Sequence, residues 1–309
     1  MGNADAVWGV NSNNNIYNRG TETWKVSSGS GAWAGGFSAC PSGYFFSAPA
    51  SNTEREILKA VQGSNHVWVN YNDSVKENVW NNQRMPTVDG LEIVGDHPDA
   101  VGIEATGTMQ LVASRVNVRG AMHGIHLRRR NRNVIVANCH LYENRGVGLF
   151  LDEVNLHQIN VTGCHISYNG GGGIVVRGGG VCNMQISGCD VEANMAADGP
   201  PTANVLVDGG GVTAEIAITG CTLQHTHTCP DSANIRFVGT DRQGRTWGNL
   251  TIAGNVISDT QVNVDVQKAR GVSIVGNTFW KGYQYNLRIE DSSNVVVGPN
   301  MFDRNTNYW

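Results

Sequence analysis

The chain has 309 residues, enough for one large or two modest domains, and it contains 39 glycines but only 16% charged residues. This composition favours many turns and short strands over long helices, so the fold class we predict is all-β. A net charge of -4 gives no reason to expect attraction to nucleic acid or to an anionic membrane. No window holds 18 apolar residues, so no transmembrane segment is predicted, and no apolar signal region follows Met1.

Residues 1–85 are rich in Asn, Ser, Gly and Trp and lack the pattern that fills the rest of the chain. Within them, Val7–Tyr17 is predicted to form a strand–turn–strand hairpin with an Asn-rich tip, and Val67–Asn72 is a weaker echo. The first segment resembles a blade hairpin of the tectonin family of lectin-like propellers. Ser51–Gln62 is the best helix candidate, because its apolar residues share one face and Thr53 can cap it. We interpret residues 1–85 as a cap region with a fold of its own.

From residue 86 onward a short segment recurs. The stretches Asn138–Asn144, Gly163–Asn169 and Gly188–Asn194 align position for position, as NCHLYEN, GCHISYN and GCDVEAN. Relaxing the match extends the series to nine anchors, 22 to 34 residues apart: Leu91, Val116, Cys139, Cys164, Cys189, Cys221, Asn255, Asn277 and Asn300. Apolar residues in each unit fall in pairs at i and i+2, which is typical of short strands with one buried face. Each unit is therefore predicted to contain three short strands.

A unit with one apolar face per strand cannot bury that face alone, so successive units must stack about 4.8 Å apart. We predict a single-stranded solenoid, a parallel β-helix of about nine coils, over residues 86–309. The run resembles the right-handed, pectin-lyase-like β-helices, whose inward Asn ladder Asn255, Asn277 and Asn300 would match. It is also similar to uncharacterised β-helix repeat proteins of planctomycete type. These resemblances imply a right-handed fold and, for the second group, no assigned activity.

Four of the seven cysteines occupy equivalent inward positions of consecutive coils: Cys139, Cys164, Cys189 and Cys221. We predict a stack of buried free thiols, since the Cβ vectors of in-register parallel neighbours suit the disulfide dihedral badly. The other three, Cys40, Cys182 and Cys229, have no evident partners. The cysteines therefore assign no redox compartment.

Outward residues of successive strands form rows across the coils, because side chains alternate between the two faces of a strand. The row on the second strand of each unit contains His140, His165 and Asp190, with Tyr142 and Glu192 two residues further along. A carboxylate beside an imidazole orients it, so His165 next to Asp190 is a candidate acid–base pair. Asp190 and Glu192 lie about 7 Å apart by strand rise, which is compatible with either stereochemical course of glycoside hydrolysis.

If the chain is an enzyme, His165 is predicted to be the base or acid and Glu192 the general acid. Asp190 would orient His165 or serve as a second carboxylate. Two long loops, Met195–Ala203 and His225–Ala233, follow the second strands of their coils and are expected to wall a groove over this row.

The outward row on the third strand alternates in charge: Arg128, Asp152, Arg177 and Asp208. We expect its residues either to form exposed ion pairs worth about 0 to 1 kcal/mol each or to line the base of a binding site for a sugar acid. In the second interpretation Arg177 and Arg236 grip a carboxylate in bidentate fashion, Arg177 acting as the charge clamp. Asp152, Asp208 and Arg177 also have the residue types that pectate-lyase-like enzymes use for calcium and for a base. No cofactor is predicted, and Ca²⁺ is the alternative.

His225 and His227 bracket Thr226, with Asp231 nearby, but one H-x-H in a loop is a weak metal signal and no metal ligand is predicted. Aromatic residues gather near the end of the chain, as cover for the last coils or as a platform for sugar rings: Trp280, Tyr283, Tyr285, Phe302, Tyr308 and Trp309.

The predicted function is recognition of a polysaccharide along an exposed face, with cleavage by a lyase or a hydrolase mechanism left open. A rigid row with fixed spacing suits a repeating polymer. The competing prediction is a non-catalytic structural or adhesive protein, in which the outward rows only keep the surface soluble. The expected partner is a polysaccharide and not nucleic acid or a membrane, and the expected location is extracellular or at the cell surface.

Overall fold

The computed structural model describes residues 86–303, except 211, 226, 243, 244 and 247, and four short strands earlier in the chain. Every regular element in this described part is a β-strand. The chain divides into two compact units, one of residues 1–88 with 106–112 and one of residues 89–105 with 113–309.

The first unit contains an antiparallel sheet in the order β3-β2-β1-β4, formed by β1 (Val7–Val10), β2 (Ile16–Asn18), β3 (Thr23–Lys25) and β4 (Ile57–Lys59). The pair β1–β2 is the hairpin predicted for Val7–Tyr17. The helix predicted for Ser51–Gln62 is wrong over Ile57–Lys59, because these residues pair with β1. Ile57 and Leu58 are apolar, and pairing with another apolar strand outweighs a weak local helix preference. The segment Val67–Asn72 lies outside the described residues.

The strands that follow range from 2 to 16 residues: β5 (Thr87–Asp89), β6 (Glu92–Val94), β7 (Val101–Thr106), β8 (Val112–Ser114), β9 (Asn117–Arg119), β10 (His123–Ala137), β11 (His140–Tyr142), β12 (Val147–Thr162), β13 (His165–Ser167), β14 (Gly172–Arg177), β15 (Gly180–Ser187), β16 (Asp190–Glu192), β17 (Ala203–Asp208), β18 (Ala214–Thr219), β19 (Thr222–Gln224), β20 (Ala233–Val238), β23 (Gly248–Ala253), β24 (Val256–Gln267), β25 (Arg270–Val275), β26 (Thr278–Glu290), β27 (Ser293–Val297) and β28 (Met301–Phe302). A separate antiparallel hairpin, β21 (Asp241–Arg242) with β22 (Arg245–Thr246), widens one corner.

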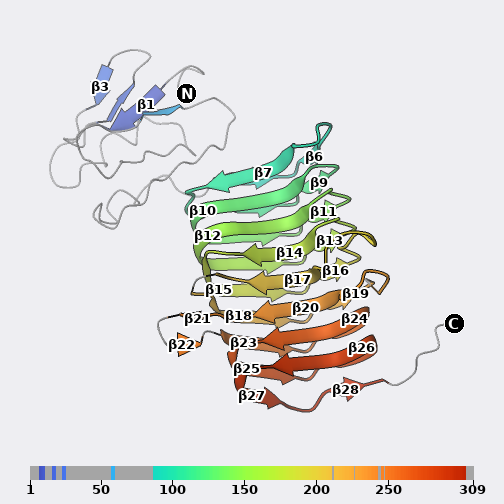
Figure 1. The fold of residues 1–309 in the computed structure, drawn as a ribbon. Helices are drawn as coiled ribbons and strands as arrows, with labels where there is room; N and C mark the ends of the chain where they lie inside the picture. The colour runs from blue at the N-terminus through green and yellow to red at the C-terminus, as the bar shows by residue number, and fades with distance from the viewer. Residues whose placement is uncertain are drawn as a thin grey trace. The chain divides into compact units, whose positions relative to one another are not determined.

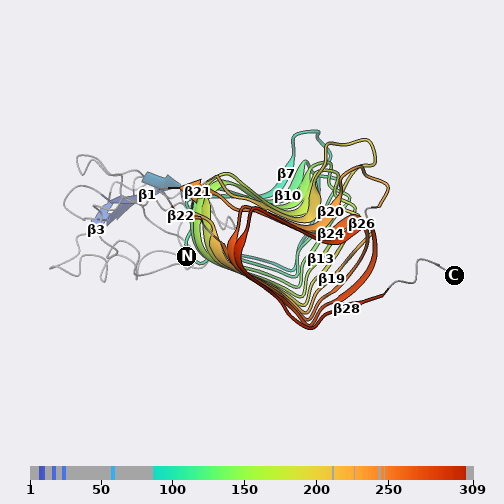
Figure 2. The same cartoon turned by 60° about the horizontal axis from the view of Figure 1, so that its bottom comes forward.

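The second unit is a parallel solenoid whose coils lie one above the next (Figure 1). Each coil contributes a first, a second and a third strand to three sheets, which we name the first, second and third sheet. The second sheet runs β6-β9-β11-β13-β16-β19-β24-β26-β28, all parallel. Each of the nine sequence anchors is the residue immediately before one of these nine strands, and the solenoid has about eight turns. Figure 2 shows how the strands of successive coils superimpose.

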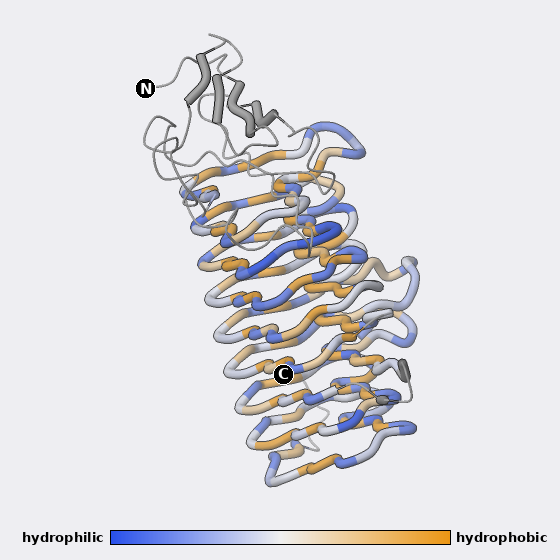
Figure 3. The backbone as a smooth tube through the Cα atoms, turned by 90° about the vertical axis from the view of Figure 1, so that its left-hand side faces the viewer, coloured by the Kyte–Doolittle hydropathy of each residue, from blue (hydrophilic) through white to orange (hydrophobic). Residues whose placement is uncertain are grey.

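The inward side chains form columns that run through the coils. Leu141, Ile166 and Val191 are in-register neighbours on β11, β13 and β16, and all three are fully buried. Apolar residues recur in the same way along every coil in Figure 3. These columns are the dry core that the i, i+2 pattern predicts.

The anchor position carries a column of thiols that continues as a column of amides. Cys139, Cys164, Cys189 and Cys221 are buried free cysteines, as predicted. Asn255 Oδ1 accepts a hydrogen bond from the backbone N–H of Cys221, Asn255 Nδ2 donates to Asn277, and Asn277 Nδ2 donates to Asn300. The predicted Asn ladder is therefore confirmed in its contacts.

A second asparagine ladder lies at the corner between the second and third sheets, where it was not predicted. Each side-chain amide donates to the next one along the series Asn144, Asn169, Asn194, Asn204, Asn234, Asn263 and Asn286. Asn194 and Asn204 belong to the same coil and flank the first long loop. In the preceding coil the residue equivalent to Asn204 is Gly173. A Cβ on Gly173 would lie 2.9 Å from Asn194 Nδ2. The ladder therefore passes across the base of the loop without interruption.

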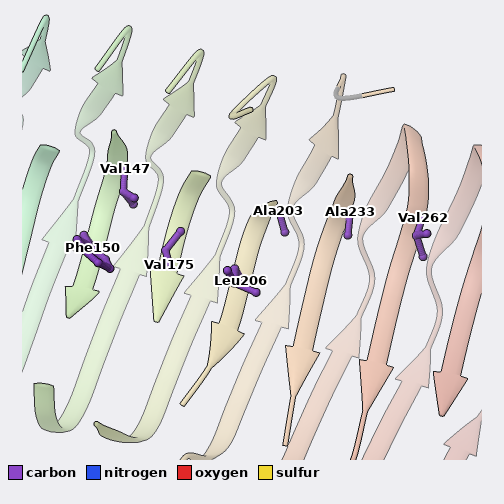
Figure 4. Close-up of a cluster of buried hydrophobic side chains, with 7 residues drawn as sticks. All are labelled: Val147, Phe150, Val175, Ala203, Leu206, Ala233 and Val262. Carbon is purple, nitrogen blue, oxygen red and sulfur yellow. The ribbon is translucent and has the colours of Figure 1, made fainter. Parts of the chain in front are cut away.

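Part of the outer face of the third sheet is unexpectedly apolar. Figure 4 shows a cluster of buried side chains along β12, β14, β17, β20 and β24: Val147, Phe150, Val175, Ala203, Leu206, Ala233 and Val262. Phe150 points outward, since Arg177, which is exposed, places its guanidinium 5.9 Å from the centroid of the Phe150 ring. Ala203 and Ala233 are the ends of the two long loops, and Cys229 within the second loop is fully buried. The second loop contacts the third sheet through Asp231, whose Oδ1 lies 3.2 Å from Arg236 Nη2.

Candidate functional site

A pocket of about 260 Å³ lies on the outer face of the second sheet, between β13, β16 and β19. It is lined by His165, Ser167, Asp190, Val191, Glu192, Thr222 and Gln224. The structure therefore brings the three predicted catalytic residues, His165, Asp190 and Glu192, into one hollow. The alternation of the strands explains this, because the residues on either side of buried Val191 must both point outward.

The row of imidazoles above the pocket is ordered. His140 and His165 are in register, and their rings stack with centroids 4.8 Å apart and planes 3° from parallel. His165 Nδ1 lies 3.5 Å from Asp190 Oδ2, and both side chains are slightly more than half exposed. Asp190 thus faces the δ nitrogen of His165, and the ε nitrogen is the one left to exchange a proton with another molecule.

Glu192 is held by two donors, one on each oxygen. Tyr168 donates its hydroxyl to Oε1 at 2.8 Å, and Gln224 Nε2 donates to Oε2 at 3.0 Å. The hydrogen bond to Glu192 and the carboxylate charge raise the pKa of Tyr168 above that of an ordinary tyrosine, so the phenol remains a donor. Tyr168 was not predicted as a site residue. The sequence feature that could have indicated Tyr168 is its position in the repeat, one residue before Asn169 of the asparagine ladder. Its backbone is left-handed, at φ 57°.

Neither long loop walls this pocket, because none of its lining residues comes from 195–203 or 225–233. This corrects the predicted groove. The loops join the second strand to the third strand, and the second loop is held on the third sheet by Asp231, which contacts Arg236. Tyr142 lies in the row two positions on, between Arg119 and Ser167, and it also lies outside the pocket lining.

The charged row on the third strand has the predicted register, with Arg128 beside Asp152, Asp152 beside Arg177 and Arg177 beside Asp208. It lies on a different sheet from the pocket. Asp152 Oδ2 is 3.7 Å from Arg128 Nε and 3.2 Å from His126 Nε2. Asp152 therefore contacts both His126 and Arg128, which lie on the same sheet.

Arg236 lies elsewhere on the third sheet and is buried. Its register neighbours are Leu206 and Asp265. Arg236 Nε is 2.8 Å from Asp265 Oδ2 and its Nη2 is 3.2 Å from Asp231 Oδ1, while Arg288 binds the same two carboxylates. This network already occupies the guanidinium that was predicted to grip a sugar acid. The hydrogen bonds from Arg288 and Arg236 lower the pKa of Asp265 although burial opposes them.

A histidine cluster that the sequence did not indicate lies on the outer third sheet. The His126 ring stacks on Phe150 with centroids 5.0 Å apart, and His123 contacts both rings at the same distance. His123 Nδ1 accepts the backbone N–H of Val147 at 3.0 Å. Burial, and then the neighbouring His126, lower the pKa of His123 to about 4. The segment HGIH carries both histidines, but only coil stacking reveals that Phe150 covers them.

Among the described residues, no group of three or more His, Cys, Asp or Glu side chains is arranged to hold a metal ion. The described part of the chain also has no helix suited to crossing a bilayer. At the far end, Tyr283 and Tyr285 are each 51% exposed, and Phe279 stacks on Phe302. Tyr308 and Trp309 lie outside the described residues.

The stacked parallel coils with an inward column and an exposed outer row define the molecule as a β-solenoid. The family described as the right-handed β-helix region matches residues 60–223, which is more than half of the chain, and the chain belongs to that family. The family includes polysaccharide-acting enzymes and also non-catalytic members. No curated protein and no solved structure matches the chain.

Proposed function

We propose that the outer face of the second sheet binds a polysaccharide and that the pocket around Asp190 is the centre of the binding site. The observation that carries this proposal is the convergence of His165, Asp190 and Glu192 in one pocket of about 260 Å³. The row that contains them repeats at the spacing of parallel strands, so a polymer with repeating polar groups meets repeating partners. Membership of the β-helix family agrees with this substrate class without selecting it.

The same residues have the chemistry for cleaving a glycosidic bond. In this proposal His165 takes or gives a proton through Nε2 while Asp190 orients the ring at Nδ1. Glu192 is the second acid–base carboxylate, and its two oxygens accept hydrogen bonds from Tyr168 and Gln224, which position it. Arg177, Asp152, Asp208 and Arg128 lie on the third sheet, so we propose them as contacts for charged groups of the polymer outside the pocket. Tyr142 and His140 extend the binding row above it.

The competing proposal is a binding or adhesive protein without catalysis. The openness of the second sheet favours it, because the long loops do not enclose the pocket and cannot exclude water from it. In both proposals the partner is a polysaccharide, no cofactor is needed, and the protein works outside the cell or at its surface.

One experiment separates the two proposals. The full chain is incubated with acidic and neutral polysaccharides, and the products are assayed for unsaturated ends and for reducing ends. Unsaturated ends indicate a lyase, reducing ends alone indicate a hydrolase, and binding without either product indicates an adhesive protein. We expect Glu192→Gln to lower the rate of cleavage by about 100-fold or more, since general acid catalysis contributes about 10² to 10⁴.

The matched control is Gln185→Ala, an exposed outward residue on the first sheet of the same part of the solenoid. It should leave binding and cleavage unchanged. If wild-type protein binds none of the polysaccharides, or if Gln185→Ala and His165→Ala weaken binding equally, the pocket is not the site.

A further inference from the structure

Two histidines of the second long loop face one buried carboxylate at the corner of the next coil. His225 Nε2 lies 3.4 Å from Asp259 Oδ2, and His227 Nδ1 lies 3.3 Å from Asp259 Oδ1. The Asp259 side chain is only 4% exposed, whereas the two imidazoles are 44% and 45% exposed. Tyr283 donates its hydroxyl to Asp259 Oδ1 at 3.0 Å and contacts the His227 ring. Asp259 is thus buried and held in place, while both imidazoles remain partly exposed to solvent.

The fold creates this arrangement from residues that are far apart in the chain. His225 follows β19 and Asp259 lies within β24, which pairs with β19, and both have left-handed backbone, at φ 62° and 61°. Lys281 occupies the corresponding corner of the following coil, with Nζ 4.9 Å from the centroid of the Trp280 ring. Gln261 Nε2 donates to the backbone carbonyl of His227, which ties the loop to β24. Both histidines are therefore held by contacts to a neighbouring coil.

The use of the ring nitrogens indicates what the cluster can bind. Each imidazole turns one nitrogen to Asp259, so the proton of the neutral ring belongs on that nitrogen. The lone pair is then on the other nitrogen, Nδ1 of His225 and Nε2 of His227. A histidine that binds a metal through one nitrogen commonly donates the other N–H to a carboxylate, which fixes the tautomer and orients the ring. Asp259 supplies that carboxylate to two rings at once.

We propose that His225 and His227 bind a divalent transition metal ion that prefers imidazole, with Zn²⁺ as the representative, and that Asp259 is the orienting carboxylate. No third protein ligand is proposed, because no group of three or more His, Cys, Asp or Glu side chains among the described residues is arranged to hold a metal ion. The remaining coordination positions are open to water or to an outside ligand. Ca²⁺ is not the ion, because it takes oxygen ligands. This site is independent of the pocket on the second sheet and of the polysaccharide proposal.

The test is isothermal titration calorimetry of the full chain with Zn²⁺ after treatment with a chelator. We expect one Zn²⁺ per chain in the wild type. His225→Ala and His227→Ala should each weaken binding at least tenfold. Asp259→Asn keeps both ligands and should weaken binding by about 10- to 100-fold, as loss of an orienting carboxylate does. Replacing Zn²⁺ by Co²⁺ gives a visible spectrum that should change in the two histidine variants.

The chain provides a matched control in its other histidine pair. His140 and His165 stack 4.8 Å apart on exposed strands, so the double variant His140→Ala/His165→Ala removes two imidazoles and should retain wild-type affinity. Tyr283→Phe keeps both ligands and Asp259, and circular dichroism checks that each variant is folded. Absence of Zn²⁺ binding in the wild type overturns the proposal. So does equal binding by the wild type and a folded His225→Ala/His227→Ala variant, or loss of binding in the His140/His165 control.

Discussion

The outer faces of the second and third sheets follow the same alternation but meet different surroundings. On the second sheet the outward row of His140, His165 and Asp190 is exposed and polar. On the third sheet the outward residues Val175 and Leu206 are 0% and 8% exposed. Both rows point away from the central column. Strand alternation therefore decides which side chains point outward, but packing against neighbouring groups decides whether an outward side chain is exposed to solvent.

The largest effect is expected from a cavity in the apolar cluster on the outer third sheet, which tests whether outward side chains there are buried. Leu206→Ala should lower the free energy of unfolding by about 2 to 5 kcal/mol, because it removes buried methyl groups from the apolar cluster on this face. Chemical denaturation measures the change. The control is Val256→Ala, since Val256 is 48% exposed and continues the outward row of the second sheet beyond Thr222. It should change stability by less than about 0.5 kcal/mol. Equal losses in both variants would contradict the comparison.

The asparagine ladder at the corner between the two faces gives the next effect. Asn169 Nδ2 donates to the Leu141 carbonyl and to Asn194, and its Oδ1 accepts from Asn144. Asn169→Ala should cost about 1 to 3 kcal/mol for a buried polar group left without a partner. Urea denaturation compares it with Asn160→Ala, an exposed strand residue in the same part of the solenoid. A variant as stable as the control would show that water replaces the ladder.

The pH dependence of stability also distinguishes the two faces. The pKa of His123, on the third sheet, is lowered to about 4 in the fold from an ordinary 6.5, mainly by burial. The unfolded chain therefore binds the proton more readily, and the contribution of neutral His123 is fully present above pH 6.5 and is lost as pH falls through 4. His123→Asn should reduce this loss, measured by thermal unfolding between pH 7 and about 4. The equivalent change on the second sheet, His140→Asn, should leave it in place.

The smallest effect concerns the charged row at the open edge of the third sheet. Arg128 is half exposed and lies 3.7 Å from Asp152. Arg128→Ala should cost less than about 1 kcal/mol, and added salt should shrink the difference from wild type, since exposed ion pairs are weak and screened. Denaturation at low and at high salt measures it. A loss above 2 kcal/mol would mean that the row contributes to stability as a buried network does.

The sequence by itself determined the coil. Recurring Cys139, Cys164 and Cys189 at a constant interval, each followed two residues later by an apolar residue, specify strand register and an inward column. The reason is local: a period of two sets the face of a strand, and matched units can only stack. His165, Asp190 and Glu192 were found for the same reason, because their positions follow from alternation alone.

Only the tertiary structure decided what the irregular segments do. The long loops do not line the pocket, Ile57–Lys59 joins a sheet in place of the predicted helix, and Arg236 is enclosed by Asp265 and Asp231. Asp259 meets His225 and His227 although 32 residues separate it from the nearer one in the chain. Such contacts leave no period in the sequence, since each depends on which distant surface offers the larger buried area and the better hydrogen-bond partners.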